Sequence, residues 1–132
     1  MKLLLVGGGG REHALAWKLR RDDSALEIIA APGNPGIATL ARCVPVATTD
    51  IIALLELAKA EDVDIVLVGP EAPLAAGLVD VFRAAGVPVF GPTRRAAEIE
   101  TSKRFSKELM LRAGVPTARA EHFSDPAAAK EA

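Results

Sequence analysis

Aromatic residues and cysteine are scarce in this sequence of 132 residues. Only 4% of the residues are aromatic, and the 16 lysines and arginines are balanced by 17 aspartates and glutamates. We expect no nucleic-acid partner, because nucleic-acid surfaces are usually basic and often carry aromatic side chains that stack on bases. The single cysteine, Cys43, excludes an internal disulfide and a site built from several thiolates. We expect it to pack as a small apolar residue.

A long apolar segment is also missing. The apolar run at residues 3–6 is ended by four consecutive glycines at residues 7–10. It is far shorter than the apolar core of a signal peptide or the roughly 20 residues of a membrane-spanning helix. The sequence therefore predicts a cytoplasmic protein with no membrane partner. Half of its residues are apolar, which is enough for one domain with a buried core.

Short apolar runs alternate along the chain with longer segments of helical periodicity. Runs rich in β-branched residues predict strands at residues 2–6, 27–31, 43–47, 64–68 and 88–90. This alternation is typical of a parallel sheet whose strands are joined by crossover helices. We therefore predict an α/β fold, a Rossmann-like parallel sheet of about five strands with helices on both faces. In a 3-2-1-4-5 strand order, the first and fourth strands are neighbours where the order reverses.

The helical segments carry start and stop signals. Thr49 or Asp50 is expected to cap one helix, and Pro73 is expected to open another that Gly86 ends. From residue 93 the pattern changes to helical pieces at 94–99 and 102–113 and an extended stretch near 117–123. We predict one domain at residues 1–92 and the incomplete beginning of a second at 93–132.

The final residues predict one more helix. Ser124 or Asp125 offers a cap, and Pro126 would take the first helical position. Only about six residues follow the proline, and a helix this short is marginal in water. We therefore expect the chain to be part of a longer polypeptide.

The four glycines join the first predicted strand to a helix. The dinucleotide pattern G-x-G-x-x-G requires a third glycine where this sequence has Glu12 or His13, and the second strand lacks the acid that binds a ribose. No Gly-Lys-Ser or Gly-Lys-Thr follows, so the Walker pattern also fails. Two interpretations stay open. The loop holds a phosphate monoester with bare N–H groups at the positive helix end, or it is a tight turn without a ligand.

Two further glycine loops follow predicted strands at the same edge. In "VGPEAPLAAG" (68–77), Glu71 is either an acceptor for sugar hydroxyls or an amine, or a first-turn carboxylate favoured by the helix dipole. In "APGNPG" (31–36), Asn34 is either a turn residue, which we favour, or a ligand contact. Arg11 either binds a phosphate or is exposed to solvent, and the sequence favours neither. We expect His13 to pack on Trp17 rather than contact a ligand. The sequence indicates no catalytic residue and no metal-ligand spacing.

Four segments in order, "GGGGREHALAWKL", "APGNPG", "VGPEAPLAAGLVD" and "VFGPTRRAAEIETSKRFSKELMLRAGVPTA", give a more specific signal than any single loop. Together they resemble the N-terminal part of the phosphoribosylamine–glycine ligase family. The resemblance implies an ATP-grasp enzyme of purine biosynthesis that joins glycine to 5-phosphoribosylamine with ATP and Mg²⁺ through a glycyl phosphate intermediate. It also implies a Rossmann-like domain followed by the truncated start of an ATP-grasp domain.

Carried over by position, the resemblance implies site residues as well. The substrate phosphoribosylamine would be cradled by Gly8, Gly9 and Gly10, with Glu12 as a further candidate, and its ribose and amine would face the loop of Glu71 and Pro73. Lys103 resembles the lysine that ATP-grasp enzymes place on nucleotide phosphates; without the family it is an exposed helix lysine. The ligands of Mg²⁺ and most of the glycine site would lie outside these residues. We therefore expect this chain alone to be catalytically inactive, because phosphoryl transfer requires positioned cations.

Two other functions remain open from the sequence. The chain is a stand-alone Rossmann-like nucleotide-binding module, or it is the N-terminal domain of another ATP-grasp ligase such as biotin carboxylase. A stand-alone module should end after the last element of its sheet, whereas here a lysine-bearing helix and the start of another helix follow the sheet. The segments "GGGGREHA" and "GPEAPL" favour the purine enzyme over biotin carboxylase.

Overall fold

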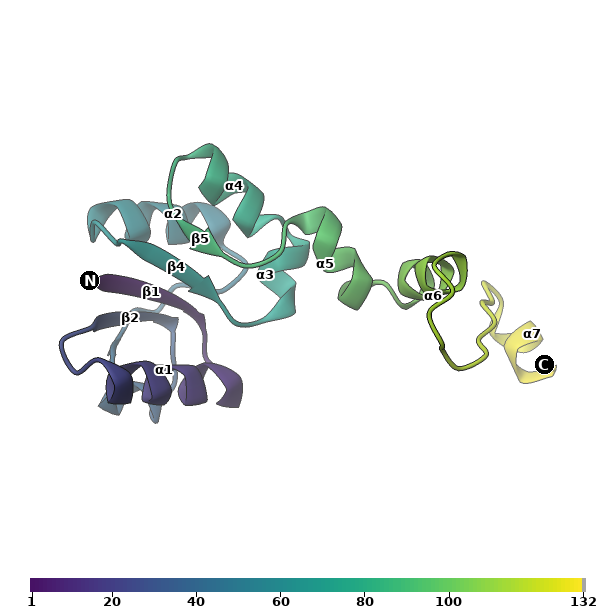
Figure 1. The fold of residues 1–132 in the computed structure, drawn as a ribbon, viewed down its shortest axis with the longest axis horizontal. Helices are drawn as coiled ribbons and strands as arrows, with labels where there is room; N and C mark the ends of the chain where they lie inside the picture. Colours follow the sequence, from purple (N-terminus) through teal and green to yellow (C-terminus); the bar gives the residue numbers. More distant parts are fainter. Residues whose placement is uncertain (132) are drawn as a thin grey trace. The chain divides into compact units, whose positions relative to one another are not determined.

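The computed structural model describes residues 1–131. The chain forms two units, Met1–Ala97 and the residues from Glu98 onward. The first unit contains a five-stranded parallel sheet in the order β3-β2-β1-β4-β5 (Figure 1). Its strands are β1 (Lys2–Gly7), β2 (Glu27–Pro32), β3 (Arg42–Cys43), β4 (Ile65–Val68) and β5 (Val89–Phe90). The predicted α/β fold is confirmed, and the strand order is the one considered in the sequence analysis.

Both faces of the sheet are covered by helices. Side chains of β1 alternate between the two faces of the sheet, as the two-residue period of a strand requires. Leu4 and Val6 pack in the core cluster on one face, and Leu3 and Leu5 pack in the cluster on the other. On one face the sheet packs against α1 (Gly10–Asp22) and the short 3₁₀ helix η1 (Ile37–Thr39). The opposite face packs against α2 (Ile51–Ala60), α3 (Glu71–Ala75) and α4 (Leu78–Ala84) (Figure 1). A strand buried on both faces explains the continuous apolar run at residues 3–6.

The third strand is much shorter than the predicted 43–47. Strand β3 ends at Cys43, and the Val44 N–H still donates to Ala30 O at 2.9 Å. Pro45 follows and has no N–H to pair with β2, so the ladder stops there. Cys43 is half-buried and packs against a core cluster, as expected from the sequence.

The helix expected to open at Pro73 and run to Gly86 is two helices. Helix α3 begins at Glu71, so Pro73 is inside its first turn, and α4 begins after Gly77. Gly77 has φ of 92°, a left-handed conformation that ends α3 and redirects the chain. The cap at Asp50 is confirmed, because its carboxylate accepts the Ala53 N–H at 3.1 Å.

The second unit is helical. Helix α5 (Arg94–Thr101) begins in the first unit and is followed by α6 (Lys103–Arg112) and α7 (Pro126–Glu131). Ser102 lies outside α6 as its cap and accepts the Phe105 N–H at 3.2 Å. Asp125 accepts the Ala127 N–H at 2.9 Å just before α7, as the sequence predicts. The domain boundary expected after residue 92 stays a prediction.

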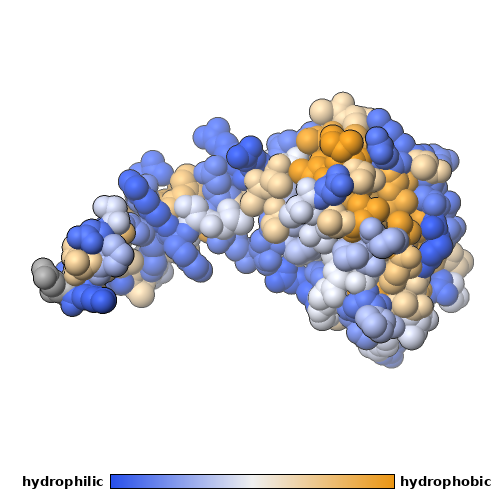
Figure 2. Space-filling view, turned by 180° about the vertical axis from the view of Figure 1, so that it is seen from behind, coloured by the Kyte–Doolittle hydropathy of each residue, from blue (hydrophilic) through white to orange (hydrophobic). Residues whose placement is uncertain are grey.

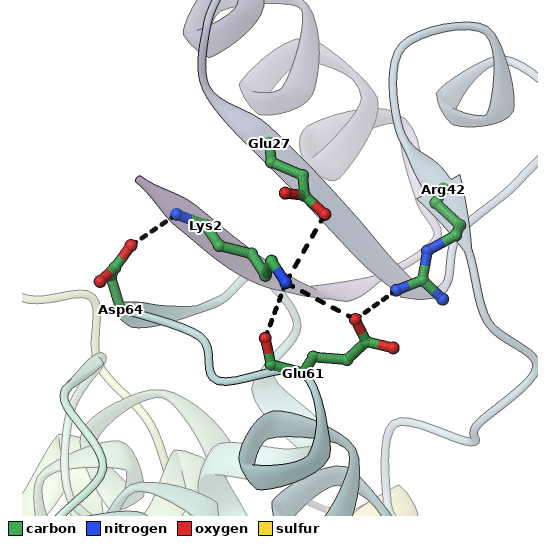
Figure 3. A network of polar contacts seen from close by, with 5 residues as sticks. All are labelled: Lys2, Glu27, Arg42, Glu61 and Asp64. Atoms are coloured by element: carbon green, nitrogen blue, oxygen red, sulfur yellow. Dashed lines mark hydrogen bonds and ion pairs between the residues drawn. The ribbon is translucent and has the colours of Figure 1, made fainter.

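Charged side chains tie together the amino ends of the strands (Figure 3). Lys2 at the start of β1 donates its ammonium to Glu61 O at 2.8 Å and lies 3.8 Å from the Glu27 carboxylate, and its backbone N–H donates to Asp64 at 2.6 Å. Arg42 reaches the Glu61 carboxylate at 2.7 Å. This network fastens three strands and the end of α2 at the edge opposite the glycine loops.

The surface is mixed. The face shown in Figure 2 carries an apolar area on the first unit, whereas hydrophilic residues dominate near the C-terminus. The large exposed apolar side chains of the first unit include Met1, Trp17, Ile52 and Phe90. Within residues 1–131, no helix combines the length and apolar character needed to cross a membrane.

Candidate functional site

Three loops meet at the carboxyl edge of the sheet. They follow β1, β4 and β2, and β1 lies between the other two strands. The order reverses between β1 and β4, which is where open α/β sheets bind ligands. The Gly33 N–H donates to Gly7 O at 3.1 Å, and the Gly69 N–H donates to Val6 O at 3.1 Å. Backbone hydrogen bonds therefore hold all three loops together at the end of β1.

Glu12 is buried between two of these loops, with 4% of its surface exposed. Its Oε2 accepts the Gly9 N–H at 2.6 Å, which is the glutamate half of a capping box, since Gly9 has no side chain to make the other hydrogen bond. A Cβ atom at Gly69 would lie 2.1 Å from Glu12 Oε1, and one at Gly7 would lie 2.5 Å from Glu12 Cγ. The carboxylate thus fills the space that these glycines leave open. The structure places Glu12 beneath the loops as an internal support.

Gly8 and Asn34 connect the glycine loop to the loop after β2. A Cβ atom at Gly8 would lie 2.5 Å from Gly33 O, so only glycine permits this approach. Asn34 Nδ2 donates to Gly8 O at 2.9 Å, and its Oδ1 accepts the Ile37 N–H at 2.8 Å. Both ends of the amide are engaged within the protein, which matches the turn role favoured from the sequence.

Gly9 and Gly10 form the exposed start of helix α1. Gly9 is the N-cap, and its N–H is committed to Glu12. A Cβ atom at Gly10 would meet no atom within 4 Å. The first-turn N–H groups of a helix lack acceptors within the helix, and the helix dipole adds positive potential there. The open surface beside the first-turn N–H groups therefore begins at Gly10.

Arg11 and Glu71 bridge the loops that follow β1 and β4. Arg11 Nη1 donates to Gly69 O at 2.6 Å and to Glu71 Oε1 at 2.8 Å. The hydrogen bond from Arg11, then one from the Glu71 backbone N–H and the charge of Arg11, lower the pKa of Glu71 below its ordinary value. The sequence assigned Arg11 to a phosphate or to solvent and missed its carboxylate partner, because the two residues are far apart in the chain.

The remaining candidates occupy different surroundings. The Pro73 side chain is fully buried, so it shapes α3 from inside rather than facing the edge of the sheet. Lys103 is exposed at the first position of α6, in the second unit. His13 lies against the loop after β2, since a Cβ atom at Gly36 would be 2.5 Å from its Cε1. Trp17, the packing partner expected for His13, carries the Arg21 guanidinium 5.2 Å from its ring centre.

The described residues hold no group of three or more His, Cys, Asp or Glu side chains placed to bind a metal ion. This observation is limited to residues 1–131. The charged and polar groups at the carboxyl edge are a helix N-terminus, the Arg11 guanidinium and the Glu71 carboxylate.

Comparisons with known proteins identify relatives over most of the chain. The model of the family described as "Phosphoribosylglycinamide synthetase, N domain" matches residues 1–100. A phosphoribosylamine–glycine ligase of Xylella fastidiosa (strain 9a5c) is 57% identical over 121 residues, 90% of this chain and 28% of the relative. One from Chlorobaculum tepidum is 52% identical over 133 residues, 98% of this chain and 31% of the relative. The chain thus spans less than a third of these relatives.

Solved structures give the same fold. The crystal structure of phosphoribosylamine–glycine ligase from Thermotoga maritima matches with a TM-score of 0.63 and 25% identity, covering 90% of this chain and 26% of that one. A biotin carboxylase domain of the 2-oxoglutarate carboxylase from Hydrogenobacter thermophilus matches with a TM-score of 0.71 and 20% identity, over 98% of this chain and 31% of that one. The second likeness shows the fold alone.

Proposed function

We propose, because this chain belongs to the family of the phosphoribosylglycinamide synthetase N domain, that its three loops form the phosphoribosylamine half-site of a phosphoribosylamine–glycine ligase. The whole enzyme would join glycine to 5-phosphoribosylamine in purine biosynthesis with ATP and Mg²⁺. The cytoplasmic location expected from the sequence belongs to the same proposal. This chain would supply substrate binding and no catalytic residue.

The observation that carries the proposal is the open surface at the start of α1. Gly10 leaves room for a ligand to approach the first-turn N–H groups, while the neighbouring glycines make room for protein atoms. A helix N-terminus is suited to a phosphate monoester. Arg11 and Glu71 lie beside it with opposite charges, and a phosphorylated sugar amine offers a partner to each.

ATP and Mg²⁺ are assigned to the whole enzyme. Lys103 is our candidate for contact with the nucleotide phosphates, on the strength of the family resemblance and its exposed position on α6. The family resemblance implies that the ligands of Mg²⁺ lie outside these residues, so we assign no residue of this chain to the metal. We therefore expect this chain alone not to form the product.

Amide NMR tests where a sugar phosphate binds. Ribose 5-phosphate, a stable substitute for the labile phosphoribosylamine, should shift the backbone amide signals from Gly10 to Glu12 and that of Glu71. The amide of Lys59, on the far end of α2, serves as a control that should not shift. Binding that shifts only signals outside the three loops would refute the proposed half-site.

The relatives support the phosphoribosylamine–glycine ligase family over the alternative of a biotin carboxylase. The likeness to phosphoribosylamine–glycine ligases reaches 57% identity, whereas the biotin carboxylase domain is 20% identical. A stand-alone nucleotide-binding module would instead bind NAD or ATP through the glycine loop and ignore ribose 5-phosphate.

A further inference from the structure

His13 lies against the loop that follows β2, at residues 33–36. It belongs to the first turn of α1, and its side chain is half-buried. A Cβ atom at Gly36 would lie 2.5 Å from His13 Cε1, 2.9 Å from its Nδ1 and 3.1 Å from its Nε2. The imidazole ring therefore covers Gly36 and occupies the space that a side chain would need there.

The backbone of Gly36 does not itself require glycine. Its φ of −69° and ψ of −44° are helical values that L-residues adopt without strain. Gly33, at the other end of the loop, differs, because its φ of 73° favours glycine. The ring of His13 is therefore what excludes a side chain at Gly36, and this contact joins α1 to the loop.

Hydrogen bonds extend this contact to the glycine loop. Asn34 Nδ2 donates to Gly8 O at 2.9 Å, and Asn34 Oδ1 accepts the Ile37 N–H at 2.8 Å. The Thr39 hydroxyl donates to Gly36 O at 2.8 Å. These bonds tie Asn34 and Gly36 into one turn. A shift at Gly36 would therefore also move the Asn34 amide and loosen its hold on Gly8.

The contacts form a closed circuit. The chain runs from Gly8 into α1 and reaches His13, whose ring covers Gly36. From the same turn, Asn34 returns to Gly8 through its hydrogen bond. Gly10, where the open surface begins, lies on the chain between Gly8 and His13. Side chains that are locked by packing and by supporting hydrogen bonds hold neighbouring groups in one geometry, so this circuit fixes the start of α1.

We propose that His13 is a positioning residue that holds the start of α1 and the loop after β2 in one arrangement. It acts through Gly36 and Asn34 and does not touch the ligand. The ring acts by its shape, so another flat ring can replace it. The consequence for ligand binding rests on the proposed function, because the loops that His13 fixes are among those assigned to the sugar phosphate.

Hydrogen exchange of the Asn34 side-chain amide, measured by NMR, tests the positioning without any ligand. In His13→Ala these amide protons should exchange faster with water, because the loop loses its contact with α1. His13→Phe keeps a flat ring over Gly36 and should keep the exchange slow. Trp17→Ala removes an exposed ring from the same helix and is the matched control, with no expected change. Unchanged exchange in His13→Ala would overturn the proposal.

Gly36→Ala tests the same contact from the other side. Its Cβ would displace the His13 ring, so the Asn34 amide should again exchange faster. In His13→Ala the space is free, and alanine suits the helical backbone at Gly36. Adding Gly36→Ala to His13→Ala should therefore cause no further increase. An equal increase in both backgrounds would show that Gly36→Ala acts independently of His13, against the proposal.

Calorimetric titration with ribose 5-phosphate tests the consequence for binding. His13→Ala should weaken the affinity about three- to tenfold, because part of the binding free energy must then order the loop. His13→Phe and Trp17→Ala should retain the affinity. If His13→Phe binds as weakly as His13→Ala while its Asn34 amide still exchanges slowly, the imidazole contacts the ligand directly and the positioning role is wrong. If the unmodified chain binds no ribose 5-phosphate, the proposed function fails, whereas the exchange measurements still decide whether His13 positions the loop.

Discussion

The glycines in the loops at the carboxyl edge have different structural roles. Gly7 and Gly69 leave room for the buried Glu12 side chain, and Gly8 permits contact with the Gly33 carbonyl. Only Gly10, among the four consecutive glycines, faces space with no atom within 4 Å of a Cβ position. The four identical letters in the sequence thus correspond to at least three physical situations.

Gly10→Val separates binding from folding. The added side chain enters the space proposed for the phosphate, so binding of ribose 5-phosphate should be lost. The free energy of unfolding should change by less than about 1 kcal/mol, since the position is an exposed helix start. Gly8→Ala is the contrasting variant and should destabilise the fold, because its Cβ would lie 2.5 Å from Gly33 O. Unaltered binding by Gly10→Val would remove Gly10 from the site.

Glu12 and Gly69 should be energetically coupled. Glu12→Ala leaves the Gly9 N–H without its acceptor and empties a buried space, at a cost of about 2–4 kcal/mol. Gly69→Ala forces a Cβ to within 2.1 Å of Glu12 Oε1. In the double variant that clash disappears. Urea denaturation should therefore give a loss of unfolding free energy smaller than the sum of the losses in the two single variants. Additive values would show that Glu12 does not fill the space beside Gly69.

The pKa of Glu71 reports on its partner. Arg11→Gln removes the largest cause of the lowered pKa, so the Glu71 carboxyl should titrate at a higher pH in the variant. Because the folded pKa lies below the unfolded one, the pair stabilises the fold above the unfolded pKa and loses this contribution as pH falls through the folded pKa. Carboxyl-carbon NMR measures both titrations. Identical curves would mean that Arg11 does not hold Glu71 in solution.

Sequence patterns predicted which residues lie near the candidate site, but they predicted few of the contacts that these residues make. The glycine loop, Asn34 and Glu71 were found because glycines and polar residues follow predicted strands. The burial of Glu12 had one local signal, its position three residues after the helix cap, which is that of a capping box. The Arg11–Glu71 pair had none, because it depends on two strands that only the folded sheet makes neighbours.

At the scale of elements, strand order was predictable and several element ends were not. Alternating strands and helices imply parallel pairing, and the order β3-β2-β1-β4-β5 is the one considered in the sequence analysis. The third strand was predicted too long because valines, which favour strands, flank Pro45. The prediction gave these valines more weight than the backbone N–H that proline lacks and that the sheet needs. The break between α3 and α4 was missed because alanines and leucines continue on both sides of Gly77.

Gly77→Ala tests that break. The position has φ of 92°, and a Cβ there would make only ordinary contacts of 3.7 Å or more. The cost therefore comes from the backbone alone and should be about 1–2 kcal/mol, measured by thermal or urea unfolding. Gly86→Ala is a matched variant with φ of 74° and no atom within 4 Å, so it should cost a similar amount. If Gly77→Ala is neutral, the two segments form one continuous helix.

At the scale of the whole molecule, the charged network and the loops proposed to bind a ligand lie at opposite edges of the sheet. The charged network around Lys2 and Glu61 fastens the amino ends of the strands (Figure 3). The three glycine loops occupy the carboxyl ends. Glu61→Gln should therefore weaken the fold slightly without affecting a ligand at the loops, and it serves as a control for every binding measurement.

The family could be predicted from the sequence because four motifs occur in the right order, and the match over residues 1–100 confirms it. The activity of the whole enzyme remains a proposal, since this chain spans 28–31% of the relatives described above. For this chain by itself, we propose that the three loops at the sheet edge bind one phosphorylated ligand.

Calorimetric titration of this chain with ribose 5-phosphate, ATP–Mg²⁺ and NAD tests that claim most directly. The account predicts saturable binding of ribose 5-phosphate, retained in Glu61→Gln and lost in Gly10→Val, with no binding of NAD. Tight binding of NAD or ATP–Mg²⁺ with no response to ribose 5-phosphate would contradict the assignment of the three loops to a sugar phosphate.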